Sequence, residues 1–158
     1  MSITSTAIAV AVNPAFLQEI KDSNPDLWSA AEDLRNTCRM QGESTTVLNR
    51  LTRLLDNLRD AIALQFSLEE SYGYIAVAEP QNEDLARKAA AAQAQHGPLY
   101  LRISDLAERA EELQYRGFEP ECFNRLVHDA IEFDHLWSSH EQLEADLVDM
   151  SLSRQAFG

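Results

Sequence analysis

The stretch LTRLLDNLRDAIALQFSLEESY, from Leu51 to Tyr72, spaces its large apolar residues at alternating steps of four and three. These steps place Leu51, Leu55, Leu58 and Ile62 on one side of an α-helix, because a helix returns to the same face about every 3.6 residues. The opposite positions are mostly polar or charged. This pattern predicts a long helix whose apolar side packs against other helices.

Proline, glycine and short polar runs divide the rest of the chain into similar segments, at about 14–40, 44–82, 83–115 and 119–151. Strong helix formers dominate each segment, and the connections are short, so neighbouring helices should run antiparallel. The sequence therefore predicts an all-α fold, an up-down-up-down antiparallel four-helix bundle over residues 14–158. Residues 1–13 are expected to form a flexible N-terminal tail. Pro25 should kink or restart the first helix, and the stretch at 96–98 should bend the third.

Composition limits the classes of partner. The chain has 158 residues, enough for one domain, and 13 Lys and Arg against 26 Asp and Glu give a net charge of -13. Such a charge repels phosphate groups, so no nucleic acid and no membrane surface is expected as a partner. No apolar run approaches the roughly 20 residues that span a bilayer. Cys38 and Cys122 have no metal-binding spacing, which favours reduced thiols and a cytoplasmic location.

Each apolar stripe has one short polar interruption. Gln65, Glu69 and Tyr72 continue the stripe of the second segment, and His140 and Glu144 lie one turn apart on the stripe of the fourth. His96 interrupts the third. Asn24 interrupts the first, whose stripe otherwise runs through Leu17, Ile20, Leu27, Ala31, Leu34 and Cys38. His128 and His135 fall off the stripes and are expected at the surface.

Antiparallel packing can bring these interruptions to one depth in the core, where a buried glutamate must be paired, protonated or bound to a metal. One interpretation makes Glu69, His96, His140 and Glu144 metal ligands, with Gln65 a weak ligand or a donor to one. The alternative is a metal-free hydrogen-bonded network that aligns the helices. Without metal, the two glutamates are expected to repel each other and raise at least one pKa. Replacing either by Gln or Leu should then leave the ion-free protein at least as stable.

Three stretches resemble bacterial hemerythrin-like, or HHE cation-binding, domains. They are LRDAIALQFSLEESYGY (58–74), AQHGPLYLRISDLAERAEEL (94–113) and SSHEQLEADL (138–147). The resemblance covers nearly all four segments from about Leu17 onward. It implies a four-helix bundle that holds a non-haem di-iron centre and serves in oxygen binding, oxygen or redox sensing, or iron handling.

The resemblance also implies a reduced ligand set. Gln65 and Asn24 stand where the family pattern has histidine, and Ala92 stands where many members have another. Glu69, His96, His140 and Glu144 match the pattern. The expected cofactor is therefore iron, as one ion, two ions or none, with O2 as a further partner and no enzymatic turnover. A metal-free bundle acting as a protein-interaction or regulatory module is the alternative, and its protein partner is not indicated by the sequence.

Overall fold

The computed structural model describes residues 9–80 and 82–157, which form a mainly α-helical protein with one small two-stranded sheet. The elements are β1 (Ala9–Val12), α1 (Pro14–Asp22), α2 (Pro25–Cys38), α3 (Ser44–Leu68), a π-helical turn η1 (Glu69–Gly73), β2 (Tyr74–Val77), α4 (Glu83–Ala94), α5 (His96–Arg116) and α6 (Pro120–Phe157). The prediction of an α-helical protein is confirmed in this broad sense, and the two strands are an addition to it.

The first predicted helix is two helices, as Pro25 indicated. Asn13 caps α1, because its side-chain oxygen accepts from the backbone N–H of Phe16 at 3.2 Å. The helix ends at Asp22, and α2 begins at Pro25, where a missing N–H costs nothing in the first turn. The short break between them lies beside the residues of the candidate site.

The second predicted helix ends earlier than expected. It stops at Leu68, widens into η1 and continues as β2, which pairs antiparallel with β1 from Val12↔Tyr74 to Ala9↔Val77. Glycine at position 73 allows this turn to pack closely against Leu17. If residue 73 had a side chain, its Cβ would lie only 3.0 Å from Leu17 Cδ1. Residues 1–8 of the expected tail lie outside the described residues, and residues 9–12 form β1.

The third predicted helix is interrupted where a bend was expected. Its two parts, α4 and α5, meet at Gln95 and His96. Pro98 has no N–H to donate to a carbonyl one turn earlier, so the continuous α-helical hydrogen bonding stops near it. The interruption puts His96 at the start of α5.

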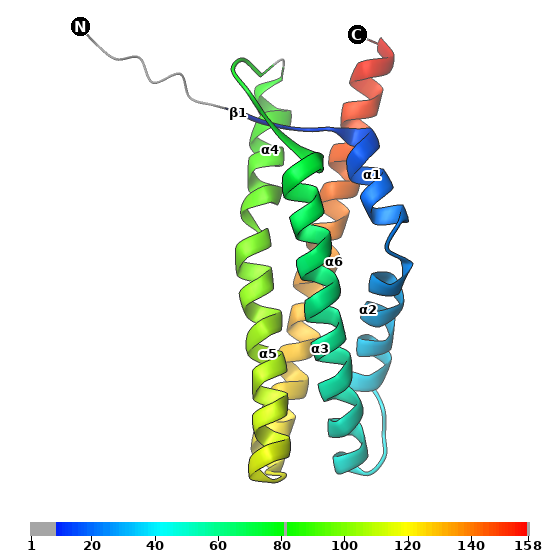
Figure 1. The fold of residues 1–158 in the computed structure, drawn as a ribbon, viewed down its shortest axis with the longest axis vertical. Coiled ribbons are helices and arrows are strands. Elements are labelled where there is room, and N and C mark those ends of the chain that lie inside the picture. The colour runs from blue at the N-terminus through cyan, green and yellow to red at the C-terminus, as the bar shows by residue number, and fades with distance from the viewer. Residues whose placement is uncertain (1–8, 81, 158) are drawn as a thin grey trace, which may run out of the picture.

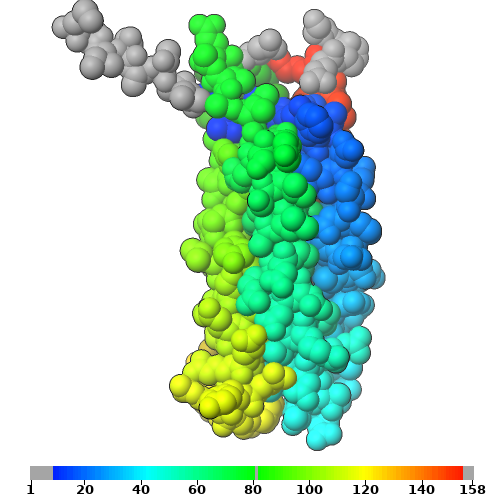
Figure 2. All heavy atoms as spheres, in the orientation of Figure 1, coloured from blue at the N-terminus to red at the C-terminus, as the bar shows by residue number. Residues whose placement is uncertain are grey.

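The helices lie side by side along the long axis of the molecule (Figure 1). α3 packs against α2 and α5, and α6 packs against α1, α2, α4 and α5. Figure 2 shows the elongated surface that α5, α3 and the α1–α2 pair form on one face. β1 crosses one end of the molecule, where the last turns of α6 also lie.

The apolar core consists of two separate clusters. The larger contains residues of α2, α3, α5 and α6, and the smaller contains residues of β1, α1, β2, α4 and α6. Four segments each pass from one cluster to the other through buried polar residues: Leu17–Lys21–Leu27, Phe66–Glu69–Tyr74, Ala92–His96–Leu99 and Trp137–His140–Glu144–Leu147. A buried layer of polar side chains therefore separates the two clusters.

Candidate metal centre

Four predicted site residues meet in this layer. Glu69 begins η1, His96 begins α5, and His140 and Glu144 lie one turn apart on α6. All four are buried, and each offers a ligand atom within 4.8 Å of the other three. The predicted convergence is confirmed, and the binding of a metal there stays a prediction. Together with Lys21 and Glu141, described below, these residues are called the polar cluster.

Both histidines turn Nε2 toward the carboxylates. His140 Nδ1 donates to Gln95 Oε1 at 2.8 Å, and His96 Nδ1 donates to Glu70 Oε1 at 2.8 Å. Because these oxygens can only accept, Nδ1 carries the proton in each ring, and a neutral ring keeps its Nε2 lone pair free. Metal-binding histidines are usually oriented by such an outer hydrogen bond.

The inward Nε2 atoms face negative charge at close range. His96 Nε2 lies 3.2 Å from Glu69 Oε1 and 3.4 Å from Glu144 Oε2. His140 Nε2 lies 3.2 Å from Glu144 Oε1. A lone pair directed at a carboxylate oxygen is repelled by it, so each nitrogen needs either a proton or a metal ion in front of it. The donor set, two imidazoles and two carboxylates, suits a divalent transition metal.

Three atoms of the polar cluster lack hydrogen bonds. Among the residues whose side chains the structure describes, His140 Nε2, Glu69 Oε1 and Glu141 Oε1 are buried polar atoms without a hydrogen-bond partner. His140 Nε2 and Glu69 Oε1 each make an ion-pair contact of 3.2 Å, but the geometry is not that of a hydrogen bond. Buried polar groups are usually satisfied, and an absent ion is one reason for an exception. His140 Nε2 and Glu69 Oε1 therefore fit ligands of a metal ion.

A buried lysine also belongs to the cluster. Lys21, near the end of α1, is only 5% exposed. Its Nζ donates to Glu144 Oε1 at 2.7 Å and Glu141 Oε2 at 2.8 Å, and it lies 3.4 Å from Glu69 Oε2. Three buried carboxylates thus surround one ammonium group. When all three are ionised, two negative charges remain uncompensated, which is the charge that one divalent cation would balance.

Burial and neighbouring charge act differently on these groups. Burial alone would lower the pKa of Lys21, but the charges of Glu144, Glu141 and Glu69 outweigh it and raise the pKa. Burial also opposes ionisation of Glu144, yet its close contacts with His140 and His96 and the charge of Lys21 hold its pKa well below the ordinary value. Burial raises the pKa of Glu141 to about 7. The expectation of a raised pKa is therefore wrong for Glu144.

The two weaker candidates adjoin Lys21. Gln65 is fully buried, and its Nε2 donates to Glu69 Oε2 at 3.3 Å. Asn24, which is half-buried, donates through Nδ2 to Gln65 Oε1 at 3.3 Å. Glu69 Oε2 is also the oxygen that faces Lys21. Asn24 and Gln65 therefore form a hydrogen-bonded chain that orients Glu69, on the lysine side of the cluster.

Aromatic rings close the other sides of the cluster. Tyr74 donates its hydroxyl to Glu144 Oε2 at 2.6 Å, and Phe66 stacks on His96 with ring centroids 4.0 Å apart. Burial, followed by the charge of Glu144, raises the pKa of the Tyr74 phenol, so it stays a donor at neutral pH. Tyr72, expected on the buried stripe, is exposed, because η1 changes the helical phase after Glu69.

Sequence spacing did contain a signal for Lys21. It lies four residues after Leu17 and three before Asn24, the spacing of the other stripes, whereas the expected Ile20 is only partly buried. Lysine is rarely buried, so the burial of Lys21 in place of Ile20 goes against the ordinary preference of the two residue types. Glu141 had no such signal, since it lies next to His140 and off the stripe. The roles of Glu70 and Gln95 as acceptors for the two histidines had no such signal either, because their positions depend on η1 and on the break between α4 and α5.

The remaining histidines lie at the surface, as predicted. His128 and His135 are exposed, and among the described residues His128 forms a candidate cation group with Asp129 and Glu132 on the outer side of α6. Exposed acidic groups of this kind commonly bind no ion. The polar cluster is the better metal-site candidate because its ligands are buried and oriented.

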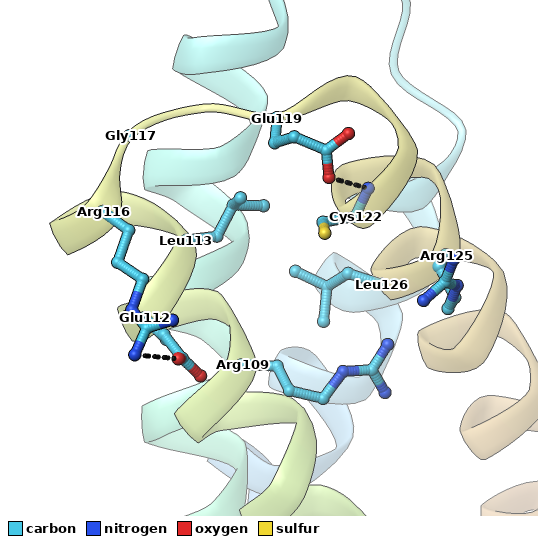
Figure 3. Close-up of a pocket in the computed structure, with 9 residues that line it drawn as sticks. All are labelled: Arg109, Glu112, Leu113, Arg116, Gly117, Glu119, Cys122, Arg125 and Leu126. Carbon is cyan, nitrogen blue, oxygen red and sulfur yellow. Dashed lines mark hydrogen bonds and ion pairs between the residues drawn. The ribbon is translucent and has the colours of Figure 1, made fainter.

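Two surface hollows differ in their relation to the cluster. One, of about 290 Å³ at the α5–α6 turn, is shown in Figure 3. It lies far from the cluster, and two of its arginines are paired, Arg116 with Glu112 and Arg109 with Asp129. The other, of about 350 Å³ between α2 and α6, is lined in part by Trp28 and Glu141. It therefore adjoins the cluster at Glu141.

Comparisons with protein-family models, with curated proteins and with solved structures found no match. Within the described residues, none of the helices combines the length and the apolar character needed to cross a membrane. Cys38 is half-buried, Cys122 is exposed, and both are free thiols.

The stability of the ion-free protein should fall as the pH rises above neutrality. Burial alone would lower the pKa of His96, but its close contacts with the carboxylates of Glu144 and Glu69 raise the pKa from 6.5 to about 10. Protonation of His96 thus favours folding; this contribution is complete below pH 6.5 and is lost as the pH rises through 10. Glu141, with its pKa raised to about 7, acts with the same sign between pH 4.5 and 7.

We expect the free energy of unfolding of chelator-treated protein to fall by about 3 kcal/mol between neutral pH and pH 10. Urea titrations at stepped pH values, followed by circular dichroism, measure it. The variant His96→Gln should show a flatter profile over the same range. A wild-type stability that stays constant or rises toward pH 10 would contradict the assignment of a proton to His96 in the ion-free state.

Proposed function

We propose that this protein is a hemerythrin-like metal-binding protein, with Glu69, His96, His140 and Glu144 as the ligands. In this proposal, α1 and α2 together, α3, α4 and α5 together, and α6 are the four members of an up-down-up-down antiparallel bundle. The metal is iron, and the protein serves in metal binding or in oxygen or redox sensing rather than in catalysis. The free thiols and the acidic surface are compatible with a cytoplasmic protein.

One observation carries the proposal. Two buried histidines each donate a hydrogen bond from Nδ1 to an oxygen outside the ligand set. Their Nε2 atoms point at two buried carboxylates. His140 Nε2 and Glu69 Oε1 have no hydrogen bond, although they are enclosed. A bound cation would satisfy both atoms and balance the excess negative charge of the cluster. The preference for iron rests on the resemblance, since this donor set also suits manganese and zinc.

A second candidate is a metal-free bundle used as an interaction or regulatory module. The observation in its favour is Lys21, which already pairs with three carboxylates without any ion. In that case the cluster fixes the alignment of the helices, and function lies on the acidic surface. The two candidates differ in whether the purified protein contains metal.

The test is elemental analysis of protein purified without a histidine tag, combined with its optical spectrum in air. We expect bound iron, its loss after chelation, and recovery with a rise in melting temperature when Fe²⁺ is added anaerobically. The variant His128→Ala/His135→Ala is the matched control, because it removes two exposed histidines and should bind normally. If neither Fe²⁺, Mn²⁺ nor Zn²⁺ binds the chelated protein or raises its melting temperature, the metal-free candidate replaces this proposal.

A further inference from the structure

The carboxylates of the polar cluster are shared between two sides. Glu69 turns Oε1 toward His96, at 3.2 Å, and Oε2 toward Lys21, at 3.4 Å. Glu144 likewise contacts Lys21 at 2.7 Å and both histidines at 3.2 and 3.4 Å. One side therefore presents imidazole nitrogens, and the other presents an ammonium group. Carboxylates that reach two sides in this way are placed to hold two cations.

The lysine side has the surroundings of a cation site. Nζ of Lys21 is enclosed by oxygens of Glu69, Glu141 and Glu144. Asn24 and Gln65 are the next neighbours, through the hydrogen-bonded chain that ends on Glu69 Oε2. Oxygen ligands of this kind can bind a divalent cation at about 2.0–2.2 Å, but Nζ already occupies the space between them.

We infer that Lys21 takes the place of a second metal ion, so that the cluster binds one divalent ion on its histidine side and excludes another. This inference rests on the proposed function and adds the number of ions and the residue that sets it. Two arguments support it. Nζ and a second ion cannot share the same oxygens, and a divalent ion beside the ammonium group would be strongly repelled in a buried site.

The same inference predicts the effect of introducing histidine at positions 24 and 65. Restoring histidine at 24 and 65 supplies ligands on the lysine side, but it leaves the ammonium group between them. The variant Gln65→His/Asn24→His is therefore expected to bind one ion, like the wild type. Adding Lys21→Gln to that variant removes the ammonium group and should allow two. These two proteins differ only at position 21, so they form a matched pair.

The experiment titrates Mn²⁺ into chelated protein under anaerobic conditions and counts bound ions by equilibrium dialysis. Electron paramagnetic resonance then distinguishes an isolated Mn²⁺ from a magnetically coupled pair. We expect one isolated ion in the wild type and in Lys21→Arg, which keeps the positive charge. We expect two coupled ions in Lys21→Gln and in the Lys21→Gln/Gln65→His/Asn24→His variant.

Each other outcome has a defined meaning. Two ions in the wild type or in Lys21→Arg, or one ion in both neutral variants, would overturn the role of Lys21 while leaving a metal-binding protein. No bound Mn²⁺ in the wild type would overturn the inference, and the proposed function fails with it if Fe²⁺ and Zn²⁺ do not bind either. If the neutral variants do not fold even with Mn²⁺ present throughout purification, the inference also fails, because a second ion should then replace the charge of the lysine.

Discussion

Replacing Glu144 by glutamine is expected to lower the free energy of unfolding of the ion-free protein by about 3–5 kcal/mol. The same replacement at Glu141 should change it by less than about 1 kcal/mol. The two residues lie on the same helix, three positions apart, and each accepts a hydrogen bond from Lys21, at 2.7 and 2.8 Å. The two distances alone would predict equal losses of stability for the two variants.

The difference follows from their ionisation. His140, His96 and Lys21 hold the pKa of Glu144 well below its ordinary value, so the folded protein is stabilised by its ionised form. Glutamine removes that charge and leaves Lys21 with weaker partners. Burial raises the pKa of Glu141 to about 7, so its ionised form is disfavoured in the folded state. Glutamine resembles the protonated form and should therefore cost little there.

Urea unfolding of chelated wild type, Glu144→Gln and Glu141→Gln at pH 7 measures both values. Equal losses for the two variants, or a gain in stability for Glu144→Gln, would show that Lys21 does not depend on Glu144. The sequence predicts unchanged or greater stability for this variant, because it suggests that Glu144 is one of two repelling carboxylates. The lysine reverses that expectation, because removing one partner of a buried ion pair leaves the other uncompensated.

The affinity of the metal ion should fall by more than about 100-fold when His140 is replaced by alanine. Loss of an outer hydrogen-bond partner already costs about 10–100-fold in metal affinity, and loss of a ligand should cost more. Both kinds of loss, of the ligand and of its outer hydrogen-bond partner, can be tested at the ring of His140. His140→Ala removes the ligand nitrogen, whereas Gln95→Leu removes only the oxygen that accepts from Nδ1 at 2.8 Å.

Competition with a chromophoric chelator, using Fe²⁺ or Mn²⁺ with chelated protein, gives the three affinities. We expect the order wild type, Gln95→Leu, His140→Ala, with Gln95→Leu about 10–100-fold weaker than the wild type. His135→Ala, an exposed histidine on the same helix, should bind like the wild type. Undiminished affinity in His140→Ala, with its circular dichroism unchanged, would remove His140 from the ligand set.

Several features of the candidate site were predictable because they depend on helical periodicity. The steps of three and four around Glu69, His96, His140 and Glu144 predicted that these residues face the core, and all four do. The same periodicity predicted exposed positions for His128 and His135. Pro25 indicated the restart of the first helix, since the ring removes a hydrogen-bond donor.

Other features depend on contacts between segments that are distant in the chain. β1 and β2 exist because residues 9–12 meet residues 74–77. Their Val, Ile and Tyr residues favour strands, but each run of four residues obtains its ladder hydrogen bonds only from a partner distant in the chain. The early end of α3 depends on Gly73, which lies against Leu17. Tyr74 rather than Tyr72 contacts Glu144, because the π-helical turn η1 changes which residues face the core.

Periodicity is a local property of the chain, so an α-helical protein with one polar interruption in each apolar stripe could be predicted from the residues alone. The presence of Lys21 and Glu141 beside these interruptions depends on how the helices pack together. The burial of a lysine is favourable only when carboxylates from other helices surround it, and here α6 and η1 provide them, 48 to 123 residues further along the chain. That arrangement gave Glu144 and Glu141 opposite pKa shifts, which no spacing of residues could predict.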